Sequence, residues 1–422
     1  MPTIIPSLFD RVWRWVFKKA PPSELLIHID QFAMFGLGVA AAKMMSAATQ
    51  IVLGRFLGPA DYGQVTVVLI LSGYFAIPIS TGWGLAYTRI VAEETQTPKV
   101  FQALKSLLLL TLVLAVGVGF CLTAVSAPLA HLFSLSLSIM HMTVALSLAS
   151  AFWILSKQIA QAFQRWSVYV IIELIWAGMV LAAVLSAVGL GRHNLQFVCL
   201  AFLLGYCVSS FGAVRFVIQA MRHRASAYYL RRIVSHGGFL LLNALIAMAT
   251  FNVDRLLIHH ALGPEQVGIY QAHFMATYGL VSSVLTIIIT YAFPLFCRDD
   301  SRRLHRQLKR ITIIQYPITL LVTLGFGAIA LWFYQYPFSI VLYVCLSLFC
   351  AVQFHSQIKA WYFAGQGTDA TRRVLGAHIV FLCVNVVTLL ILVSRVGVLS
   401  GGIALLAAGC AMLGYLCFLE RR

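Results

Sequence analysis

The sequence predicts an all-α integral membrane protein of about twelve transmembrane helices, arranged as two pseudo-symmetric six-helix bundles. Three observations predict it: the chain is too apolar for water, apolar runs of helical length recur along it, and a short motif occurs twice. Of the 422 residues, 61% are hydrophobic and 10% are charged, and the mean hydropathy is +0.90. A soluble domain carries about 25% charged residues. The solvent of this chain is therefore lipid.

Apolar segments of about 20 residues, the length that spans the hydrocarbon core of a bilayer, recur over the whole chain. The gaps between them are short and no alternating ten-residue segments occur, so helices are expected rather than barrel strands. The predicted spans cover approximately residues 31–54, 64–90, 104–126, 138–163, 168–189, 196–219, 234–260, 266–295, 311–333, 338–364, 374–394 and 397–418.

The net charge of +17 follows the predicted topology. If the N-terminus lies inside, all but five of the 30 Lys and Arg residues fall in cytoplasmic segments or at the cytoplasmic ends of spans. Arg55, Arg192 and Arg395 fall on the opposite face, and Lys43 and Arg255 lie within spans. This asymmetry is typical of the positive-inside rule with both termini cytoplasmic. Most of the basicity is therefore explained by the topology, and little of it is left to indicate a nucleic-acid partner.

The chain divides into four predicted regions. Residues 1–24 form a cytoplasmic amphipathic segment without a signal-cleavage site, 25–219 the N-terminal lobe, 220–233 a basic cytoplasmic linker, and 234–422 the C-terminal lobe. The nine cysteines include no C-x-x-C pair, so no metal site is predicted. No G-x-x-x-x-G-K loop occurs, so no cofactor and no ATP hydrolysis are expected of the chain.

A repeated motif marks the two halves. "LGPADYG" at 57–63 closes the first span, and "LGPEQVG" at 262–268 closes the seventh. Gly-Pro after an apolar run is a helix stop, and two copies after corresponding helices indicate a duplication. A second echo aligns "SKQIAQAFQR" at 156–165 with "QIKAWYFAGQ" at 357–366, which matches Lys157 to Lys359. Parallel repeats of six spans predict a cavity between two lobes.

The segments "LGRFLGPADYGQVTVVL", "GWGLAYTRIVAEE" and "NVDRLLIHHALGPEQVGIYQAHFMATYGLVSSVLTIIITYAFPLF" resemble the multidrug/oligosaccharidyl-lipid/polysaccharide exporter superfamily. Within it they are similar to the polysaccharide-unit flippases, the O-antigen or repeat-unit translocases. The resemblance implies a V-shaped cavity that opens alternately to each face of a bacterial inner membrane. It implies as cargo an oligosaccharide on a polyprenyl diphosphate such as undecaprenyl diphosphate. The unit would pass to the periplasmic leaflet for O-antigen, capsule or exopolysaccharide assembly, with membrane lipids, a glycan polymerase and chain-length proteins as partners.

Charged residues within the spans are the candidate site. An ionisable side chain in hydrocarbon costs several kcal/mol and therefore tends to face a cavity. Cations outnumber acids here, and a cationic pathway attracts an anion such as a diphosphate. The predicted substrate-binding residues are Lys43, Arg89, Lys157, Lys359 and Arg255, and the candidates for coupling or structural charge are Glu173, Asp254 and His273.

Each of these residues also has a structural interpretation. Lys157, Lys359 and Arg89 reach the inner headgroups if they snorkel. Asp254 and Arg255 are adjacent on a helix and point about 100° apart, so each is open to a structural partner on another helix. His273 is open to a role as a hydrogen-bonded core histidine. Transport driven by a proton gradient, a sodium gradient or the membrane potential remains open.

Three other functions compete with the flippase prediction. A multidrug or cation antiporter of the same superfamily should present acids rather than bases in its cavity. A peptidoglycan-precursor flippase should have additional helices. A membrane-embedded glycan polymerase or ligase needs large outer loops, whereas the outer connections here are short. The prediction is therefore a transporter and not an enzyme.

Overall fold

The computed structural model describes the backbone of residues 23–94, 96–191, 194–296, 301–365 and 368–421. These residues form α-helices joined by short turns, and no strand occurs among them. Ten of the described helices are long and apolar enough to cross a membrane, or eleven when one bent pair counts as a span. The predicted all-α membrane fold is confirmed.

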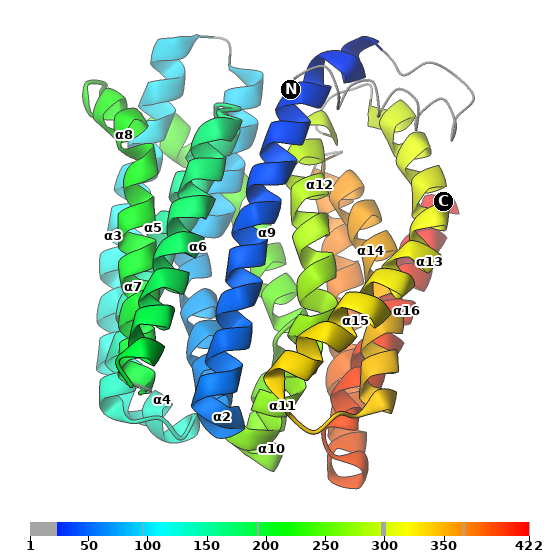
Figure 1. The fold of residues 1–422 in the computed structure, drawn as a ribbon. Helices are drawn as coiled ribbons and strands as arrows, with labels where there is room; N and C mark the ends of the chain where they lie inside the picture. The colour runs from blue at the N-terminus through cyan, green and yellow to red at the C-terminus, as the bar shows by residue number, and fades with distance from the viewer. Residues whose placement is uncertain (1–22, 95, 192–193, 297–300, 366–367, 422) are drawn as a thin grey trace.

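The first helix, α2 (Ser23–Glu93), is two crossings rather than one. Its apolar part of 60 residues is about three times as long as a bilayer core requires. Gly58 breaks it with φ 75° and ψ 169°, a conformation reserved for glycine. Beyond the break the hydroxyl of Tyr62 donates to Oε1 of Gln50 at 3.0 Å, although a straight helix would hold these residues about 18 Å apart. The chain folds back here (Figure 1), which brings the crossings to the predicted twelve.

The N-terminal lobe surrounds the two arms of α2. Its core gathers Phe35, Trp166 and Tyr169, with both partner rings set edge-on to Phe35. The remaining elements of the lobe are α3 (Thr97–Ala124), α4 (Ser126–Leu132), α5 (Leu137–Ala162), α6 (Trp166–Gly189), α7 (Leu195–Ser210) and α8 (Val214–Met221).

The C-terminal lobe repeats this plan around a core that includes Tyr270, Phe349 and Phe381. Its elements are α9 (Ala227–Thr250), α10 (Val253–Leu262), α11 (Pro264–Phe274), a π-helical turn (Met275–Gly279), α12 (Leu280–Phe296), α13 (Ser301–Tyr334), α14 (Ile340–Gly365), α15 (Thr368–Val396) and α16 (Leu399–Arg421).

The structure adds detail to three of the predicted segments. The seventh span is not one helix over 234–260, because α9 ends at Thr250 and α10 begins at Val253. The predicted linker 220–233 is largely helical, since α8 reaches Met221 and α9 begins at Ala227. The eighth span bends by 45° after its π-helical turn. Most of the amphipathic segment predicted over 1–24 lies outside the described residues.

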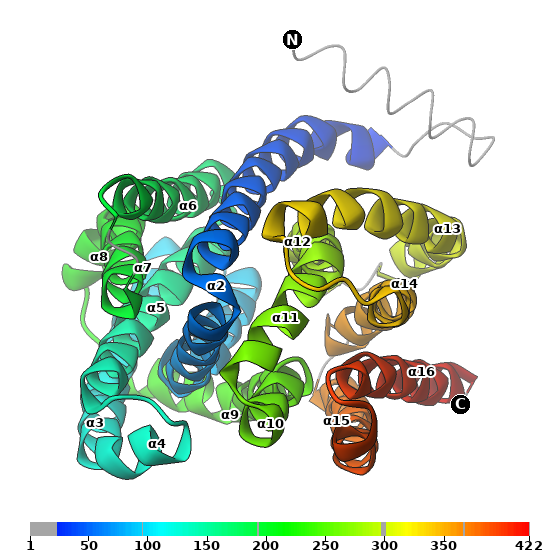
Figure 2. The ribbon, with the colours of Figure 1, turned by 60° about the horizontal axis from the view of Figure 1, so that its bottom comes forward.

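The repeat is visible in the backbone. Gly263 has φ 87° and ψ 173°, nearly the values of Gly58, and in each motif the following proline starts the next helix. Figure 2 shows the lobes side by side, with α2 and α11 adjacent between them. The end of the bundle at which Gly58 and Gly263 lie is called the LGP end below.

Candidate functional site between the lobes

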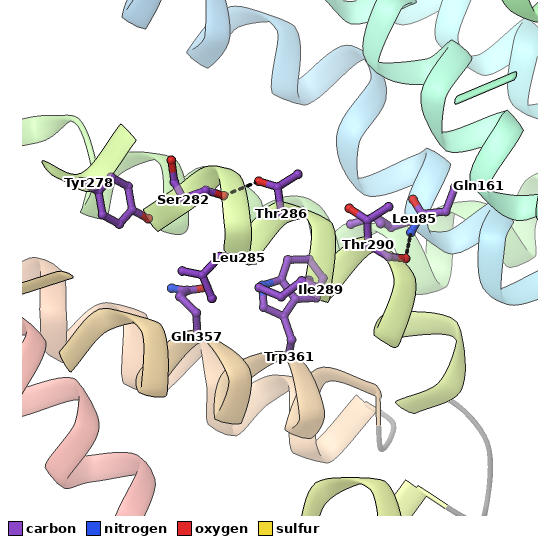
Figure 3. Close-up of a pocket in the computed structure, with 10 residues that line it drawn as sticks. All are labelled: Leu85, Gln161, Tyr278, Ser282, Leu285, Thr286, Ile289, Thr290, Gln357 and Trp361. Carbon is purple, nitrogen blue, oxygen red and sulfur yellow. Dashed lines mark hydrogen bonds between the residues drawn. The ribbon is translucent and has the colours of Figure 1, made fainter. Parts of the chain in front are cut away.

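A cavity of about 250 Å³ lies between the two lobes (Figure 3). Its N-terminal wall comes from the second arm of α2 and from α5, and its C-terminal wall from the π-helical turn, α12 and α14. It is lined by Leu85, Gln161, Tyr278, Ser282, Leu285, Thr286, Ile289, Thr290, Gln357 and Trp361. Most of these residues lie near the helix ends away from the LGP end. We call this space the inter-lobe cavity.

Two amides dominate the polar lining. Gln161 of the N-terminal lobe donates through Nε2 to the carbonyl oxygen of Thr290 at 3.3 Å, and this hydrogen bond joins the lobes across the cavity. Gln357 is buried, and its Nε2 has no hydrogen-bond partner among the described residues. A buried amide donor without a partner costs free energy. The Nε2 group of Gln357 is therefore a candidate donor to a polar ligand in the cavity.

The lining chemistry is neutral. The ten residues supply amides, hydroxyls, two aromatic rings and aliphatic side chains, and none of them is charged. The predicted cationic residues therefore do not form this wall. The volume lies below the roughly 300–1,000 Å³ of pockets that enclose drug-sized ligands, so a larger ligand would fit only if the lobes moved further apart.

Three predicted charges meet inside the N-terminal lobe. Glu173 on α6 is 1% exposed and accepts from Nζ of Lys157 on α5 at 2.8 Å. Nζ of Lys43 on α2 approaches the other carboxylate oxygen at 3.7 Å, which is an ion pair without a hydrogen bond. Nζ of Lys157 also lies 3.4 Å from the ring centroid of Trp153, a cation–π contact. Two lysines around one carboxylate leave a formal charge of +1.

Lys43 is the less tightly held of the two lysines. Its side chain is 24% exposed, whereas that of Lys157 is 15% exposed. Lys157 lies one helical turn before Gln161, on the same side of α5. The Lys43–Lys157–Glu173 cluster is therefore a helical turn away from the inter-lobe cavity.

Lys359 does not share this arrangement. It lies two residues from both Gln357 and Trp361, so on α14 it points about 200° away from the side chains that line the cavity. Its Nζ donates to Oε2 of Glu420 on α16 at 2.6 Å. The structure thus places Lys157 and Lys359 in separate ion pairs, one in each lobe.

Asp254 and Arg255 lie in the first turn of α10 and are buried. The hydroxyl of Tyr270 donates to Asp254, and the positive end of a helix stabilises a carboxylate in this position. Arg255 donates through Nη1 to Oδ1 of Asn252 at 2.7 Å and lies 3.8 Å from the ring centroid of Phe274. Oδ1 of Asp254, and Nε and Nη2 of Arg255, have no hydrogen-bond partner among the described residues.

His273 has a partner at each ring nitrogen. The backbone N–H of Ser339 donates to Nε2 at 3.3 Å, so Nδ1 carries the proton and donates to the carbonyl of Ile269 at 2.9 Å. The ring is fully buried and stacks on Phe338. This is the environment of a neutral core histidine.

Arg89 lies at the end opposite the LGP end. It pairs with Glu93 at 3.0 Å, and Arg232 of α9 pairs with the same carboxylate. The hydroxyl of Tyr229 donates to Glu94 at 3.0 Å and holds the pKa of that exposed carboxyl below its usual value. These contacts tie the start of α9 to the end of α2. No group of three metal-ligating side chains occurs in the part of the chain that the structure describes.

Comparison with known proteins identifies the family. A model of the family described as polysaccharide biosynthesis proteins matches residues 30–299, more than half of the chain. The chain belongs to this family. A search of curated proteins finds no match.

Solved structures show that this polysaccharide biosynthesis family member has the fold of multidrug/oligosaccharidyl-lipid/polysaccharide superfamily transporters. An inward-facing multidrug resistance transporter of the MATE family is 14% identical, with a TM-score of 0.69 over 92% of this chain and 98% of the other. The lipid II flippase MurJ in an inward closed conformation is 11% identical, with a TM-score of 0.58 over 92% and 88%. A superfamily transporter from Pyrococcus furiosus, described by the reverse polarity of its binding pocket, is 14% identical, with a TM-score of 0.64 over 93% and 95%.

The cavity-lining residues that were not predicted lie in segments that the sequence pattern marks. The repeated segments 156–165 and 357–366 contain Gln161, Gln357 and Trp361, so the echo marked the correct helices. A charge in a span is costly and therefore predicts function more strongly than an amide does, so the pattern points to the lysines of these segments and not to the glutamines. Ser282, Thr286 and Thr290 recur every fourth residue on α12, a spacing that places them on one face.

Proposed function

We propose that this protein is an alternating-access flippase that moves a polyprenyl-diphosphate-linked oligosaccharide repeat unit across a bacterial inner membrane. The unit passes from the cytoplasmic to the periplasmic leaflet and serves surface polysaccharide assembly, such as that of O-antigen, capsule or exopolysaccharide. The observation that carries the proposal is the uncharged, amide- and hydroxyl-lined cavity between the lobes of a polysaccharide biosynthesis family member.

The cavity suits a sugar better than a cationic drug. Gln161 and Gln357 each offer an amide donor and an acceptor, and Ser282, Thr286 and Thr290 offer hydroxyls. The ring of Trp361 supplies a flat apolar face for a pyranose. Among the described residues that line the cavity there is no carboxylate to balance a cation, which argues against the multidrug alternative.

The diphosphate needs a positive charge, and the Lys43–Lys157–Glu173 cluster supplies one. Lys157 is committed to Glu173 by a hydrogen bond, whereas Lys43 is more exposed and only ion-paired. In this proposal Lys43 attracts the diphosphate, and the lipid tail stays in the bilayer between the lobes. Glu173, Asp254 and His273 are the titratable groups available if transport uses a proton or sodium gradient or the membrane potential.

The charge asymmetry between the two ends of the bundle supports the proposed direction. Arg55 and Arg395 lie near the LGP end, whereas Arg89, Arg215 and Arg232 lie at the opposite end. In this proposal the LGP end faces the periplasm, an orientation that the positive-inside rule supports. The inter-lobe cavity lies nearer the cytoplasmic side, where a lipid-linked unit is made.

Gene deletion with complementation tests the proposal. Deletion should abolish one surface polysaccharide and accumulate its lipid-linked unit on the cytoplasmic leaflet, and the wild-type gene should restore export. Normal glycan with new sensitivity to cationic drugs would instead support a multidrug transporter. Lysis with accumulated peptidoglycan precursor would support a precursor flippase. Single repeat units at the surface without polymer would support a polymerase or ligase.

A further inference from the structure

Two glycines of the repeated motifs make a reciprocal backbone contact between the lobes. A Cβ added to Gly63 would lie 1.9 Å from the carbonyl oxygen of Pro264. A Cβ added to Gly268 would lie 2.0 Å from the carbonyl oxygen of Pro59. The glycine of each motif therefore packs directly against the proline carbonyl of the other motif. This is the pattern of a two-fold interface, in which residue i contacts j and j contacts i.

Only glycine fits either position. Both distances are far shorter than any contact that a real Cβ makes, and the obstructing atom is backbone that no side-chain rotation can move. A hydrogen on Cα fits there, since Cα–H groups pack on carbonyl oxygens where helices approach closely. Small residues serve this purpose generally between membrane helices.

We propose that Pro59, Gly63, Pro264 and Gly268 form a glycine seal, a gate that closes the cavity at the LGP end and must part before the cavity opens there. The seal joins α2 of one lobe to α11 of the other. Gly268 lies ten residues before Tyr278 of the cavity wall, about 15 Å along the chain of helices. The seal is therefore separate from the inter-lobe cavity and lies between it and the LGP end.

Neighbouring contacts at the same end also cross between the lobes. The hydroxyl of Tyr336 donates to the carbonyl of Gly54, and the hydroxyls of Tyr62 and Tyr334 lie 3.3 Å apart. Arg55 donates through Nη1 to the carbonyl of Phe333 at 3.2 Å. All of these are hydrogen bonds that water can replace when the lobes part, which suits a contact that opens and closes.

Substitution of either seal glycine by alanine should hold the LGP end open. Alanine favours the helical backbone over glycine, so Gly63→Ala and Gly268→Ala keep their helices. The methyl group meets only the partner's backbone, so the lobes have to separate to accommodate it. We expect the ratio of LGP-open to LGP-closed molecules to rise by roughly tenfold in each variant. Gly238→Ala is the matched control, because a Cβ at Gly238 has no other atom within 4 Å.

The measurement is a distance between spin labels on the two lobes. Labels at His131→Cys on α4 and Arg395→Cys on α15, in a variant without native cysteines, report the separation at the LGP end. The two seal variants should shift the distribution toward longer distances, and Gly238→Ala should not. An unchanged distribution in both seal variants, with the protein monodisperse, would overturn the proposal.

A second variant covers a failure to fold. Tyr336→Phe removes the hydrogen bond to Gly54 without adding volume, and it should shift the distribution in the same direction by a smaller amount. If Tyr336→Phe shortens the distances or leaves them unchanged, the LGP end is not held shut by these contacts. The measurement uses no substrate, so its result is independent of which cargo the protein carries.

Discussion

Glu173→Gln tests whether the three-charge cluster is held by its carboxylate. The substitution keeps the shape of the side chain and removes the charge that balances Lys157, which is 15% exposed, and Lys43, which is 24% exposed. Removal of one partner from a buried ion pair costs about 3–5 kcal/mol, because the remaining charge stays in a low dielectric. The cation–π contact of Lys157 with Trp153 persists and offsets about 0.5–2 kcal/mol of that loss.

Substitutions of the two lysines should lower the free energy of unfolding by different amounts. Lys43→Met removes an ion pair without a hydrogen bond and should cost about 0–1 kcal/mol. Lys157→Met leaves Glu173 with Lys43 at 3.7 Å and should cost less than Glu173→Gln. The double variant Glu173→Gln with Lys157→Met removes both charges and should regain most of the loss, since a buried pair exchanged for neutral groups is often near neutral.

Unfolding of the purified protein by heat and by SDS measures this series. Asp61→Asn is the control, because Asp61 is exposed and surface substitutions change stability by about 0.5 kcal/mol or less. A double variant as unstable as Glu173→Gln alone would refute the reasoning. So would a Glu173→Gln protein as stable as the wild type, since water rather than Glu173 would then be solvating Lys157.

The remaining predictions concern transport and the second ion pair. Lys43→Ala should lower glycan export by roughly tenfold while the protein still reaches the membrane, because the charge that it removes attracts a phosphate by about 1.7 kcal/mol; normal export would remove Lys43 from the pathway. Gln357→Leu should lower flipping of a lipid-linked oligosaccharide in vesicles by roughly tenfold, the loss of about one hydrogen bond to a buried polar group; Gln196→Leu, exposed at the LGP end, should not. Lys359→Met should lower the unfolding midpoint and leave flipping by the folded fraction unchanged, because Lys359 pairs with Glu420 away from the cavity; a flipping defect at wild-type stability would return Lys359 to the substrate path.

The fold was predictable because the bilayer leaves few choices. Span lengths follow from its thickness, and the two LGP motifs follow from a conformation that only glycine adopts. The similar φ and ψ of Gly58 and Gly263 confirm that the two copies of the LGP motif adopt the same backbone turn. The sequence pattern can predict these turns because they depend only on the backbone sterics of a few neighbouring residues.

The break in the seventh span is not predicted, although the predicted span 234–260 contains the residues that form it. Asn252 lies in the break between α9 and α10, with its Nδ2 donating back to the carbonyl of Met248 at 2.9 Å and its Oδ1 accepting from Arg255. Asparagine competes for backbone groups in this way at helix ends. Hydropathy alone predicts one continuous span here, because it does not reveal which backbone group a polar side chain will bind.

The cationic site remains a prediction. In the structure, the wall that would contact a sugar and the charge that would attract a phosphate lie in different places. The wall that touches the cavity is neutral, which suits sugar hydroxyls, while the net positive charge of the Lys43–Lys157–Glu173 cluster lies about a helical turn away. With an effective dielectric constant of about 20 and a separation of about 10 Å, one such charge attracts one phosphate charge by about 1.7 kcal/mol. That is enough to bias entry by more than tenfold and too little to trap the diphosphate. A flippase has to release its cargo on the far side, so an offset charge suits transport better than a lysine bound directly to the phosphate.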